Sequence, residues 1–304
     1  MITSKNLHKK FKTFYALKGI DLHVKKGEIY GFIGHNGAGK STTMNIFAGL
    51  SHPTDGNCIV NGLDIKKICH PSQLRIGYLP EDPNFYPWMS AFETLEYLGN
   101  SVLNTITRAR INEMLCWVGL EQAARRRAGG FSRGMKQRLG MAAALIHDPE
   151  LLILDEPSSA LDPEGRSDML SLISELKQMG KTVLFSTHIL SDVERVCDTV
   201  GMIASGKMVM EKPLAELQKD SIKPIYDVSL QSPLDWQQLE KLKRVDSVKD
   251  VMIKNDILSV TVEDVCYGSK SLMRFLFEND IPVPSFALRK NNLEDIFIQE
   301  VSEK

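Results

Sequence analysis

The sequence predicts an α/β fold for residues 1–215, a prediction that rests on two observations. Short apolar runs at Leu151–Leu154 and Thr182–Ser186 are typical of buried parallel strands, and the helical pattern Arg166–Met179 between them predicts the crossover helix of a strand–helix–strand unit. A glycine-rich loop also follows an apolar strand and precedes a helical pattern from about Lys40 to Leu50, which adds a strand, a loop and a helix in the same order.

Further strands and a helical insertion complete this first domain. The Asn61-Gly62 pair lies between two short apolar runs and is a strong signal for a two-residue hairpin. The stretch from roughly Glu93 to Ile146 lacks strand alternation, so we expect an inserted helical subdomain over about residues 85–147. Apolar segments bounded by turn signals predict the other strands, at Leu17–Val24, Glu28–Ile33, Thr199–Ala204 and Lys207–Met210.

The remainder of the chain, residues 216–304, predicts a separate α+β accessory or regulatory domain. Its first six elements have the order strand, helix, strand, strand, helix, strand, which is the order of a ferredoxin-like unit. A seventh element, a helix, is expected to follow them. In chain order the expected elements are Ile225–Leu230, Asp235–Leu242, Val248–Ile253, Ile257–Val262, Lys270–Phe277, Ser285–Arg289 and Asn292–Val301.

Composition argues against several classes of protein. Lys and Arg total 37 against 38 Asp and Glu, and a net charge of −1 is not that of a strongly basic nucleic-acid binder. The five cysteines are scattered and form no CxxC pair, so we expect neither a disulfide framework nor a zinc site, and a reducing cytosol fits best. The sequence has no run of about 18 apolar residues that would span a bilayer, and no apolar segment follows the basic N-terminus as in a secretory signal.

The glycine-rich loop carries a phosphate-binding pattern. Residues 34–41 fit G-x-x-x-x-G-K-[ST], in which backbone N–H groups surround phosphate oxygens and the following helix directs its positive end toward them. Lys40 is expected to reach the β- and γ-phosphates, and the Ser41 hydroxyl to bind Mg²⁺. The nucleotide-binding residues predicted here are Gly34, His35, Asn36, Gly37, Ala38, Gly39, Lys40, Ser41 and Thr42.

Two carboxylates follow the apolar strand at Leu151–Leu154. Open α/β sheets bind their ligands at the carboxyl ends of the strands, which is where Asp155 and Glu156 are expected. Asp155 is placed to hold Mg²⁺, and Glu156 to orient or deprotonate an attacking water. The alternative, in which both residues only cap the next helix, is less favoured because the same sheet supplies the phosphate loop.

With these motifs in place, the sequence resembles the nucleotide-binding subunit of an ATP-binding-cassette (ABC) transporter. Phe131–Met135 resembles the LSGGQ signature of that family, although Arg133 replaces a glycine and Met135 replaces a glutamine. Ser159–Asp162 is similar to the D-loop of the family, and Ser186–His188 is similar to its H-loop. Together with the two phosphate-site motifs, these elements span the first domain in the family's order.

The resemblance implies a P-loop NTPase fold with a helical and an antiparallel β subdomain, and an ATPase that uses ATP and Mg²⁺. It implies that Glu156 and His188 are catalytic, with the imidazole near the γ-phosphate, and that Asp162 belongs to the D-loop. Two chains then close head-to-tail on ATP, because the signature helix offers a second anion site to the nucleotide of the partner. The residues carried over to that second site are Ser132, Arg133, Gly134 and Met135. The implied partners are a second copy of the chain, or a paralogous ATPase, and a membrane permease.

The resemblance also concerns two further positions. At one of them this chain differs from the family, and at the other two residues are possible. The family's Q-loop carries glutamine where this chain has Glu81, which becomes a candidate ligand of Mg²⁺ that adds negative charge to the site. The ring that stacks on adenine is assigned to Phe11 rather than Tyr15, from its separation from the strand that begins at Ala16, since a flat apolar ring suffices for stacking. The alternative is that Phe11 is a core residue.

The last motif, Asn292–Phe297, resembles the tail of ATPases in the ABC-2 group, which is export-like for drugs, antibiotics and lipids. We therefore expect a subunit that powers a separate exporter from the cytoplasmic face of the cell membrane, without a nucleic-acid partner. Tyr86–Met89 is the candidate dock for the permease, with internal packing as the alternative. Two rival functions are a soluble ABC ATPase acting on ribosomes or nucleic acid, and a non-hydrolysing nucleotide sensor, against which Glu156 and His188 argue.

Overall fold

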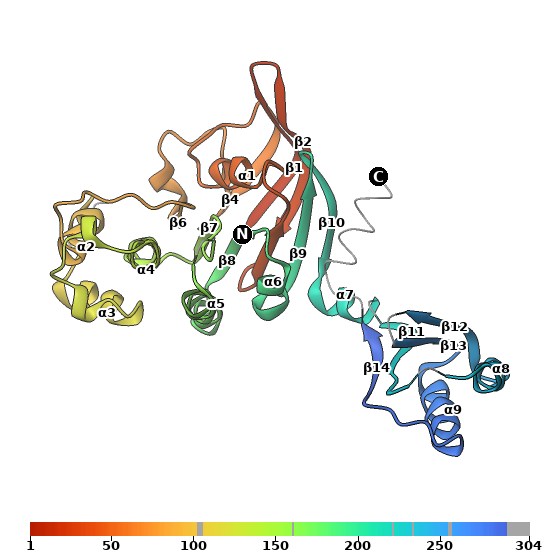
Figure 1. Cartoon of the computed structure of the whole chain (residues 1–304). Coiled ribbons are helices and arrows are strands. Elements are labelled where there is room, and N and C mark those ends of the chain that lie inside the picture. Colours follow the sequence, from red (N-terminus) through yellow and green to blue (C-terminus); the bar gives the residue numbers. More distant parts are fainter. Residues whose placement is uncertain (102–105, 160, 221, 233, 255–256, 291–304) are drawn as a thin grey trace. The chain divides into compact units, whose positions relative to one another are not determined.

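Two compact units make up the described chain, one within Met1–Leu214 and one within Ala215–Gln299. Each unit has a buried hydrophobic core of its own. Across the described residues, no helix combines the length and the apolar character needed to cross a membrane. The computed structural model (Figure 1) describes residues 1–101, 106–159, 161–220, 222–232, 234–254 and 257–290.

A six-stranded sheet forms the centre of the first unit. Its strand order is β10 (Lys207–Pro213), β9 (Thr199–Ala204), β3 (Ile29–Ile33), β8 (Thr182–Thr187), β7 (Leu151–Leu154) and β6 (Ile76–Leu79). The strands from β9 to β6 run parallel, whereas β10 pairs antiparallel with β9. All four residues of β7 are buried, which accounts for its unbroken apolar run. Because parallel strands end at one edge of the sheet, the loops after β3, β6, β7 and β8 meet there.

An antiparallel sheet and helix α1 (Lys40–Phe47) complete the core of this unit. The order of the second sheet is β2 (Phe14–Val24), β1 (Ile2–Phe11), β4 (Asp55–Val60) and β5 (Leu63–Asp64). The predicted hairpin at Asn61-Gly62 is confirmed, because β4 and β5 pair on either side of it and both turn residues have positive φ. Met44 and Phe47 of α1 join one core cluster with residues of both sheets.

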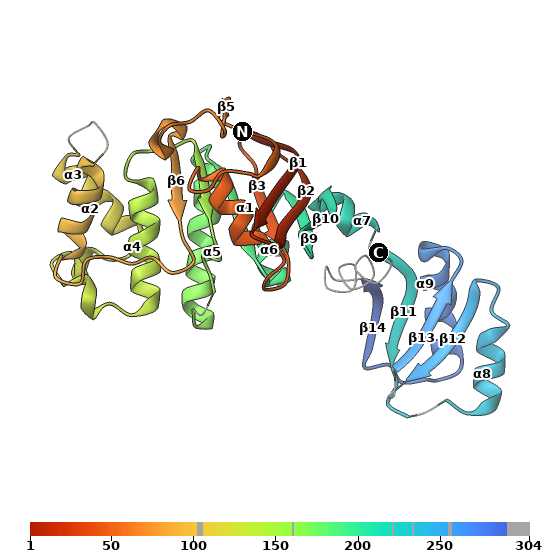
Figure 2. The same cartoon turned by 90° about the horizontal axis from the view of Figure 1, so that it is seen from above.

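Three helices gather beyond β6 at one end of the first unit (Figure 2), where the sequence predicts a helical insertion. They are α2 (Ala91–Asn100), α3 (Arg108–Trp117) and α4 (Arg133–Leu145), and short 3-10 helices cover Pro71–Leu74, Glu121–Ala123 and Ala128–Gly130. A capping box formed by Ser90 and Glu93 starts α2. The last turn of α4 lies directly on β6, because a Cβ built on Gly77 would be only 2.3 Å from the backbone oxygen of Ala144.

Three more helices follow strands of the six-stranded sheet: α5 (Pro163–Gln178), α6 (Leu190–Val196) and α7 (Leu214–Asp220). Helix α5 begins three residues before the position that its apolar pattern predicts. The cause is local, since the Asp162 side chain caps the helix by accepting a hydrogen bond from Gly165 N at 3.1 Å, and Pro163 fits its first position.

The second unit has one antiparallel sheet with two helices packed on one face (Figure 1). Its elements are β11 (Ile222–Ser229), α8 (Trp236–Lys243), β12 (Val248–Lys254), β13 (Ile257–Val262), α9 (Val265–Glu278) and β14 (Ser285–Lys290). The strand order β12-β13-β11-β14, with every pair antiparallel, is that of a ferredoxin-like unit, as the element order predicts. The helix expected at Asn292–Val301 lies outside the described residues.

Four elements of the structure, β1, β6, α6 and α7, were not expected from the sequence. The alternation in β1 is interrupted, because its register with β2 shifts between Ser4 and Leu7 and Asn6 has a φ of 50°. Strand β6 has four residues, one of them glycine, and α6 and α7 have seven residues each. Segments this short do not repeat a period often enough to be recognised.

Gly77→Ala tests the close packing of α4 on β6. The added Cβ would force a backbone shift at Ala144, so we expect the first unit to lose about 1–3 kcal/mol of stability. Thermal melting of the full chain measures the loss. Gly130→Ala is the control, because its Cβ would meet only the Arg126 side chain, at 3.7 Å. If both variants melted like the wild-type chain, the packing described here would be wrong.

Candidate active site

The predicted phosphate loop joins β3 to α1. Gly37 and Gly39 have φ values of 80° and 113°, which favour glycine, and a Cβ on Gly34 would lie 2.5 Å from the backbone oxygen of Ile203. The backbone path of the loop therefore depends on its glycines. The loop leads into the N-terminus of α1, whose first turn contains no acidic residue. Unpaired backbone N–H groups at such an end attract an anion.

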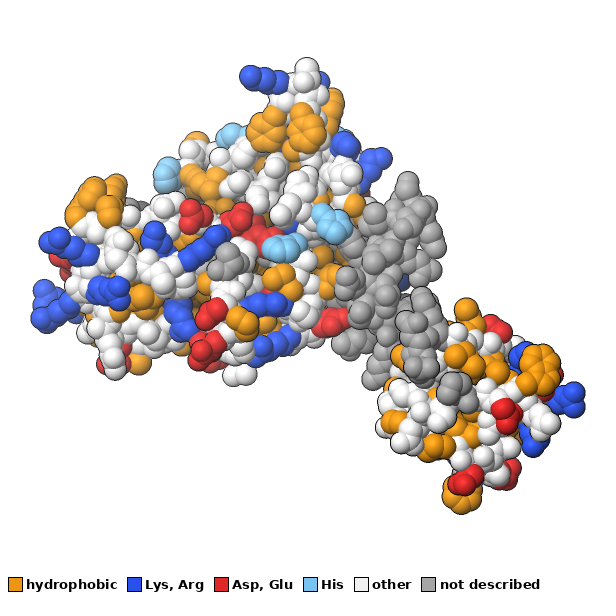
Figure 3. All heavy atoms as spheres, viewed as in Figure 1, with side chains coloured by type: hydrophobic (Ala, Val, Ile, Leu, Met, Phe, Trp, Pro, Cys, Tyr) orange, Lys and Arg blue, Asp and Glu red, His pale blue; other side chains and the backbone are white. Residues whose placement is uncertain are grey.

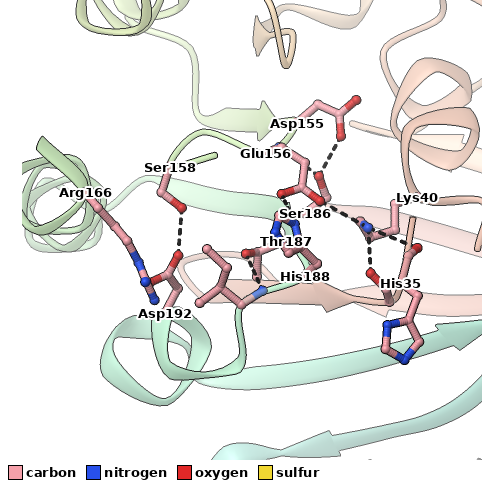
Figure 4. A network of polar contacts seen from close by, with 12 residues as sticks. His35, Lys40, Asp155, Glu156, Ser158, Arg166, Ser186, Thr187, His188 and Asp192 are labelled. Carbon is pink, nitrogen blue, oxygen red and sulfur yellow. Dashed lines mark hydrogen bonds and ion pairs between the residues drawn. The ribbon is translucent and has the colours of Figure 1, made fainter. Parts of the chain in front are cut away.

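The Lys40 side chain is buried at the start of α1 and surrounded by acceptors. Its Nζ donates to the carbonyl oxygens of Gly34 and His35, at 2.6 and 3.3 Å, and forms an ion pair with Glu156 Oε1 at 3.1 Å (Figure 4). The side chains of Lys40 and Glu156 are only 5% and 6% exposed. A buried ammonium with this set of acceptors can exchange them for the oxygens of a phosphate.

Asp155, directly after β7, is the more buried of the two predicted carboxylates. Its Oδ1 accepts a hydrogen bond of 2.6 Å from Ser186 Oγ. Burial raises the pKa of the Asp155 carboxyl, with the charge of Glu156 acting in the same direction, while hydrogen bonds from Ser186 and Ser41 oppose the shift. The hydroxyl of Ser41 is therefore close enough to the carboxyl of Asp155 to affect its pKa. That these two side chains bind one cation stays a prediction.

Glu156 has a backbone φ of 48°, which is uncommon for a residue with a side chain. Its N–H donates to Ser186 Oγ at 2.9 Å, which ties this turn to the end of β8. Its Oε2 lies 2.9 Å from His188 Nδ1 (Figure 4). The Glu156 carboxylate is therefore held between the ammonium of Lys40 and the imidazole of His188, at the edge where the parallel strands end.

One pocket of about 540 Å³ collects most of the predicted nucleotide-site residues. It is lined by Phe11, Phe14, Ala16, Asn36, Gly37, Gly39, Lys40, Ser41, Thr42, Glu81, Glu156 and His188. Three residues of the predicted loop, Gly34, His35 and Ala38, are not part of this lining. The first two instead direct their carbonyl oxygens at Lys40.

Two phenylalanines form the apolar end of the pocket. Phe11 and Phe14 face each other across the β1–β2 hairpin and are 51% and 65% exposed. This exposure does not fit the alternative in which Phe11 is a core residue. Tyr15 is absent from the pocket lining and lies beneath Lys10 Nζ, 4.8 Å from the ring centroid. Phe14 was not predicted from the sequence, because its place in the pocket depends on the pairing of β1 with β2.

Glu81 lies on the pocket wall, in the loop after β6, with an exposed side chain. Its backbone oxygen accepts a hydrogen bond of 2.7 Å from Nε2 of Gln137, a fully buried residue of α4. The loop that carries Glu81 is thereby attached to the helix that follows the signature motif. Sequence reasoning did not single out Gln137, because nothing in the order of residues shows which loop an amide on a helix will meet.

The signature residues start α4 but do not line the pocket. Ser132 caps the helix by accepting a hydrogen bond from Met135 N at 3.2 Å, and Arg133 beside it is exposed. Gly134 is half-buried, like Met135. The D-loop residue Asp162 is also outside the lining and caps α5. The N-terminus of α4, with its unpaired N–H groups, is therefore not part of the pocket that the phosphate loop of the same chain lines.

Three comparisons relate this geometry to known proteins. A family model described as ABC transporter matches residues 17–159. The uncharacterized ABC transporter ATP-binding protein YxlF of Bacillus subtilis (strain 168) is 38% identical over 303 residues, which cover 99% of each chain. The bacitracin transport ATP-binding protein BcrA of Bacillus licheniformis is 35% identical over 98% of this chain and 96% of its own length. A dimeric post-hydrolysis structure of the ATP-binding cassette MJ0796, bound to ADP and Pi, superposes with a TM-score of 0.65 at 28% identity, covering 70% of this chain and 99% of the cassette.

These similarities decide between the functions that the sequence left open. The similarity to transporter ATP-binding proteins extends over almost the whole chain, which supports the transporter over a soluble ATPase acting on ribosomes or nucleic acid. The cassette fold covers the unit in which the phosphate loop, Glu156 and His188 meet. The chain therefore belongs to the ABC transporter family, as one of its ATP-binding and ATP-hydrolysing subunits.

Proposed function

We propose that this subunit hydrolyses ATP with Mg²⁺ in a head-to-tail dimer and thereby powers a separate membrane permease. The proposal rests chiefly on the Glu156 carboxylate, which lies 3.1 Å from Lys40 Nζ and 2.9 Å from His188 Nδ1 in the wall of the phosphate-loop pocket. A buried base beside a phosphate-binding cation and an imidazole suits the attack of water on a γ-phosphate.

Each of the three residues has its own task in that reaction. Lys40 exchanges its carbonyl and carboxylate acceptors for the oxygens of the β- and γ-phosphates. The ion pair between Glu156 and Lys40 is then weakened, and the Glu156 carboxylate is available to orient a water and accept its proton. His188, 2.9 Å from Oε2, fixes the direction of the carboxylate and brings an imidazole to the γ-phosphate end of the pocket.

Ser41 and Asp155 are the residues that would hold Mg²⁺. Both offer oxygen, which this hard cation prefers, and the Ser41 hydroxyl is close enough to the Asp155 carboxyl to lower its pKa. Burial raises the pKa of Asp155, and a divalent cation beside the carboxylate would favour its ionised form. When bound, Mg²⁺ neutralises charge on the phosphates. Glu81, exposed in the same pocket, is a further candidate for its coordination.

The position of the signature helix supports a dimer. Its N-terminus and the exposed Arg133 offer an anion site, yet neither Ser132 nor Gly134 lines the pocket with the phosphate loop. The γ-phosphate that fills this site therefore comes from a second subunit, either a copy of this chain or a paralogous ATPase. The dimeric state of the related cassette MJ0796 agrees with this arrangement. Asp162, which is exposed at the start of α5, is assigned to the same interface.

An exposed aromatic cluster on the helical subdomain is the proposed dock for the permease. Tyr86, Trp88 and Tyr97 are 48%, 63% and 52% exposed, and Tyr86 lies 5.0 Å from Trp88 and 5.9 Å from Tyr97 between ring centroids. Hydrophobic side chains are visible on this part of the surface in Figure 3. Trp88 and Tyr97 also border a cavity of about 790 Å³. Such exposure disfavours internal packing, whereas aromatic residues are enriched in the centres of protein interfaces.

We further propose that the transporter is an exporter. The similarity to BcrA, which is described as a bacitracin transport ATP-binding protein, supports a transporter of that kind of compound. The resemblance of Asn292–Phe297 to the ABC-2 tail agrees with it, although those residues lie outside the described part of the chain. The subunit would then act at the cytoplasmic face of the cell membrane, attached through its permease.

Glu156→Gln tests the catalytic assignment. The amide keeps the shape of the side chain but cannot accept a proton, so hydrolysis is expected to slow by about 10²-fold or more. ATP binding is expected to persist, because the phosphate loop is unchanged, and a nucleotide-bound dimer should accumulate. Phosphate release gives the rate, and size-exclusion chromatography with ATP gives the dimer.

Lys40→Ala is the companion variant that separates loss of the base from loss of the site. It removes a charge-assisted contact to the phosphates, so nucleotide binding itself should fail. Phosphate release at the wild-type rate from Glu156→Gln would remove Glu156 from the role of base. Unchanged ATP affinity and turnover in Lys40→Ala would mean that residues 34–41 are not a phosphate site.

Glu81→Gln restores the residue that the family carries at this position. The change removes one negative charge from the pocket and keeps the shape, so basal hydrolysis should stay within about tenfold of wild type, or about 1.4 kcal/mol in the barrier. Coupling to the permease should change more, because Glu81 lines the pocket and the same loop leads on to Tyr86 of the aromatic cluster. Transport and basal hydrolysis are measured on the same variant. A complete loss of hydrolysis in the isolated subunit would make Glu81 itself a catalytic group.

Trp88→Ala tests the docking surface. Truncation of an exposed aromatic anchor should weaken co-purification with the permease by about tenfold or more. Hydrolysis by the isolated subunit should be preserved, because Trp88 does not line the nucleotide pocket. Trp236→Ala is the matched control, since Trp236 is 75% exposed in the second unit. Loss of the permease from the control but not from Trp88→Ala would move the docking surface to the second unit.

A further inference from the structure

A fully buried carboxylate, Asp192 on α6, lies behind the active site without touching the nucleotide pocket. Its Oδ2 accepts a hydrogen bond of 2.7 Å from Ser158 Oγ, and its Oδ1 accepts one of 2.6 Å from Arg166 Nε (Figure 4). A buried carboxylate is costly unless it is paired and hydrogen-bonded. Both oxygens of Asp192 meet that condition, so the cluster joins three segments through one charged group.

The first of these segments carries Glu156. Ser158 follows Glu156 by two residues and is 2% exposed. The left-handed backbone of Glu156, with φ at 48°, costs free energy and persists only where its surroundings hold it. Ser186 Oγ holds the Glu156 N–H on one side at 2.9 Å, and the bond from Ser158 to Asp192 anchors the chain on the other. Asp192 is thus one of the attachments that flank the strained residue.

The second segment carries His188. Asp192 follows His188 by four residues, and its N–H donates to the Ile189 carbonyl at 3.2 Å. The Ile189 N–H in turn donates to Thr187 Oγ1 at 3.0 Å, at the end of β8. The backbone around His188 is therefore continuous with the start of α6, on which Asp192 sits. Asp192 is therefore linked to both segments whose side chains meet at 2.9 Å in the pocket, through its carboxylate to the Glu156 segment and through its backbone to the His188 segment.

Arg166 on α5 supplies the charge that Asp192 needs. Its side chain is 30% exposed, against 1% for Asp192, so the guanidinium reaches inward from the surface. A second contact of Arg166, from Nη2 to Ser191 Oγ at 2.7 Å, keeps it against the start of α6. The positive charge of Arg166 therefore stabilises the buried carboxylate of Asp192, while Ser158 links that carboxylate to the turn that carries Glu156.

We propose that Asp192 is a positioning residue for ATP hydrolysis, which acts through Ser158 to hold the Glu156 turn against the His188 segment. This inference rests on the proposed role of Glu156 as the base. Without the link, the phosphate loop and Lys40 stay in place, but the Glu156 carboxylate loses its fixed position relative to the γ-phosphate. Turnover is then reduced while nucleotide binding is preserved.

Ser158→Ala is the decisive variant, because it removes one hydroxyl and leaves the pair between Asp192 and Arg166. We expect kcat at saturating subunit and ATP to fall by about tenfold, as misplacement of a catalytic group does. The KM for ATP and the affinity for ADP should stay at their wild-type values. Ser158→Thr keeps a hydroxyl and should restore kcat. Ser167→Ala is the matched control on α5, since its hydroxyl accepts a bond from Arg195 and not from this cluster.

A second comparison separates positioning of Glu156 from a general loss of structure. Ser158→Ala is combined with Glu156→Gln, in which there is no base left to position. The residual rate of the double variant should equal that of Glu156→Gln, because two changes that act on one group do not add. If Ser158→Ala lowers the melting temperature, we use Asp192→Asn instead, which keeps the shape of the side chain and loses its charge. Its rate is measured in the wild-type chain and in Glu156→Gln.

The outcomes distinguish this inference from the proposed function. Wild-type kcat in Ser158→Ala, or a loss of equal size with and without Glu156, would overturn the role of Asp192 and leave Glu156 as the base. An increased KM with unchanged kcat would also overturn it. Wild-type hydrolysis in Glu156→Gln would instead overturn the proposed function.

Discussion

The buried ion pair between Lys40 and Glu156 is the interaction on which the rest of the site depends. Two side chains that are at most 6% exposed carry opposite charges 3.1 Å apart, and removing either charge from water is costly. Around them the chain adds two carbonyl acceptors for Lys40 and an imidazole for the second oxygen of Glu156. In the proposed reaction, phosphate oxygens bring negative charge to the same ammonium, so a nucleotide would compete with Glu156 for it. Binding of the substrate and release of the Glu156 carboxylate would then be one electrostatic event.

The parallel sheet is what brings these two charges together. Lys40 follows β3 and Glu156 follows β7, with β8 between the two strands and His188 just beyond its end. All three strands are buried along their length, and each ends at the same edge. Ser186, at the end of β8, uses its hydroxyl to connect both carboxylates, by donating to Asp155 and accepting from Glu156 N. The polar side chains at this edge thus form one connected cluster, and the strands that carry them are buried and largely apolar.

The motifs could be predicted because they depend on short backbone paths. The loop at residues 34–41 needs its glycines and lysine in a fixed order, and Asp155 and Glu156 stand directly after an unmistakable buried strand. The ferredoxin-like order of the second unit was likewise readable from its alternating elements. Phe14 could be found only with the hairpin register known, because it enters the pocket by facing Phe11.

Asp192 and Gln137 could not be predicted from the sequence, for a different reason. Each is a polar residue on a helix whose partner lies 34 or 56 residues away in the chain, at Ser158 or at Glu81. The helical pattern predicts that polar residues lie on the exposed face of the helix, so it gives no sign that one of them will be buried. Burial depends on how the helix packs on the sheet, which is a property of the whole unit. Sequence order therefore identifies the groups that do the chemistry better than the groups that hold them.

The contact between Gln137 and Glu81 joins the wall of the nucleotide pocket to helix α4. Gln137 is fully buried on α4, and its amide holds the carbonyl of Glu81 at 2.7 Å. Helix α4 starts with the signature residues, and the Glu81 loop forms part of the nucleotide pocket. A displacement of that loop by the nucleotide is resisted unless α4 moves with it, because a buried amide that loses its partner is penalised. One hydrogen bond therefore connects the wall of the pocket to the helix that begins with the predicted signature residues.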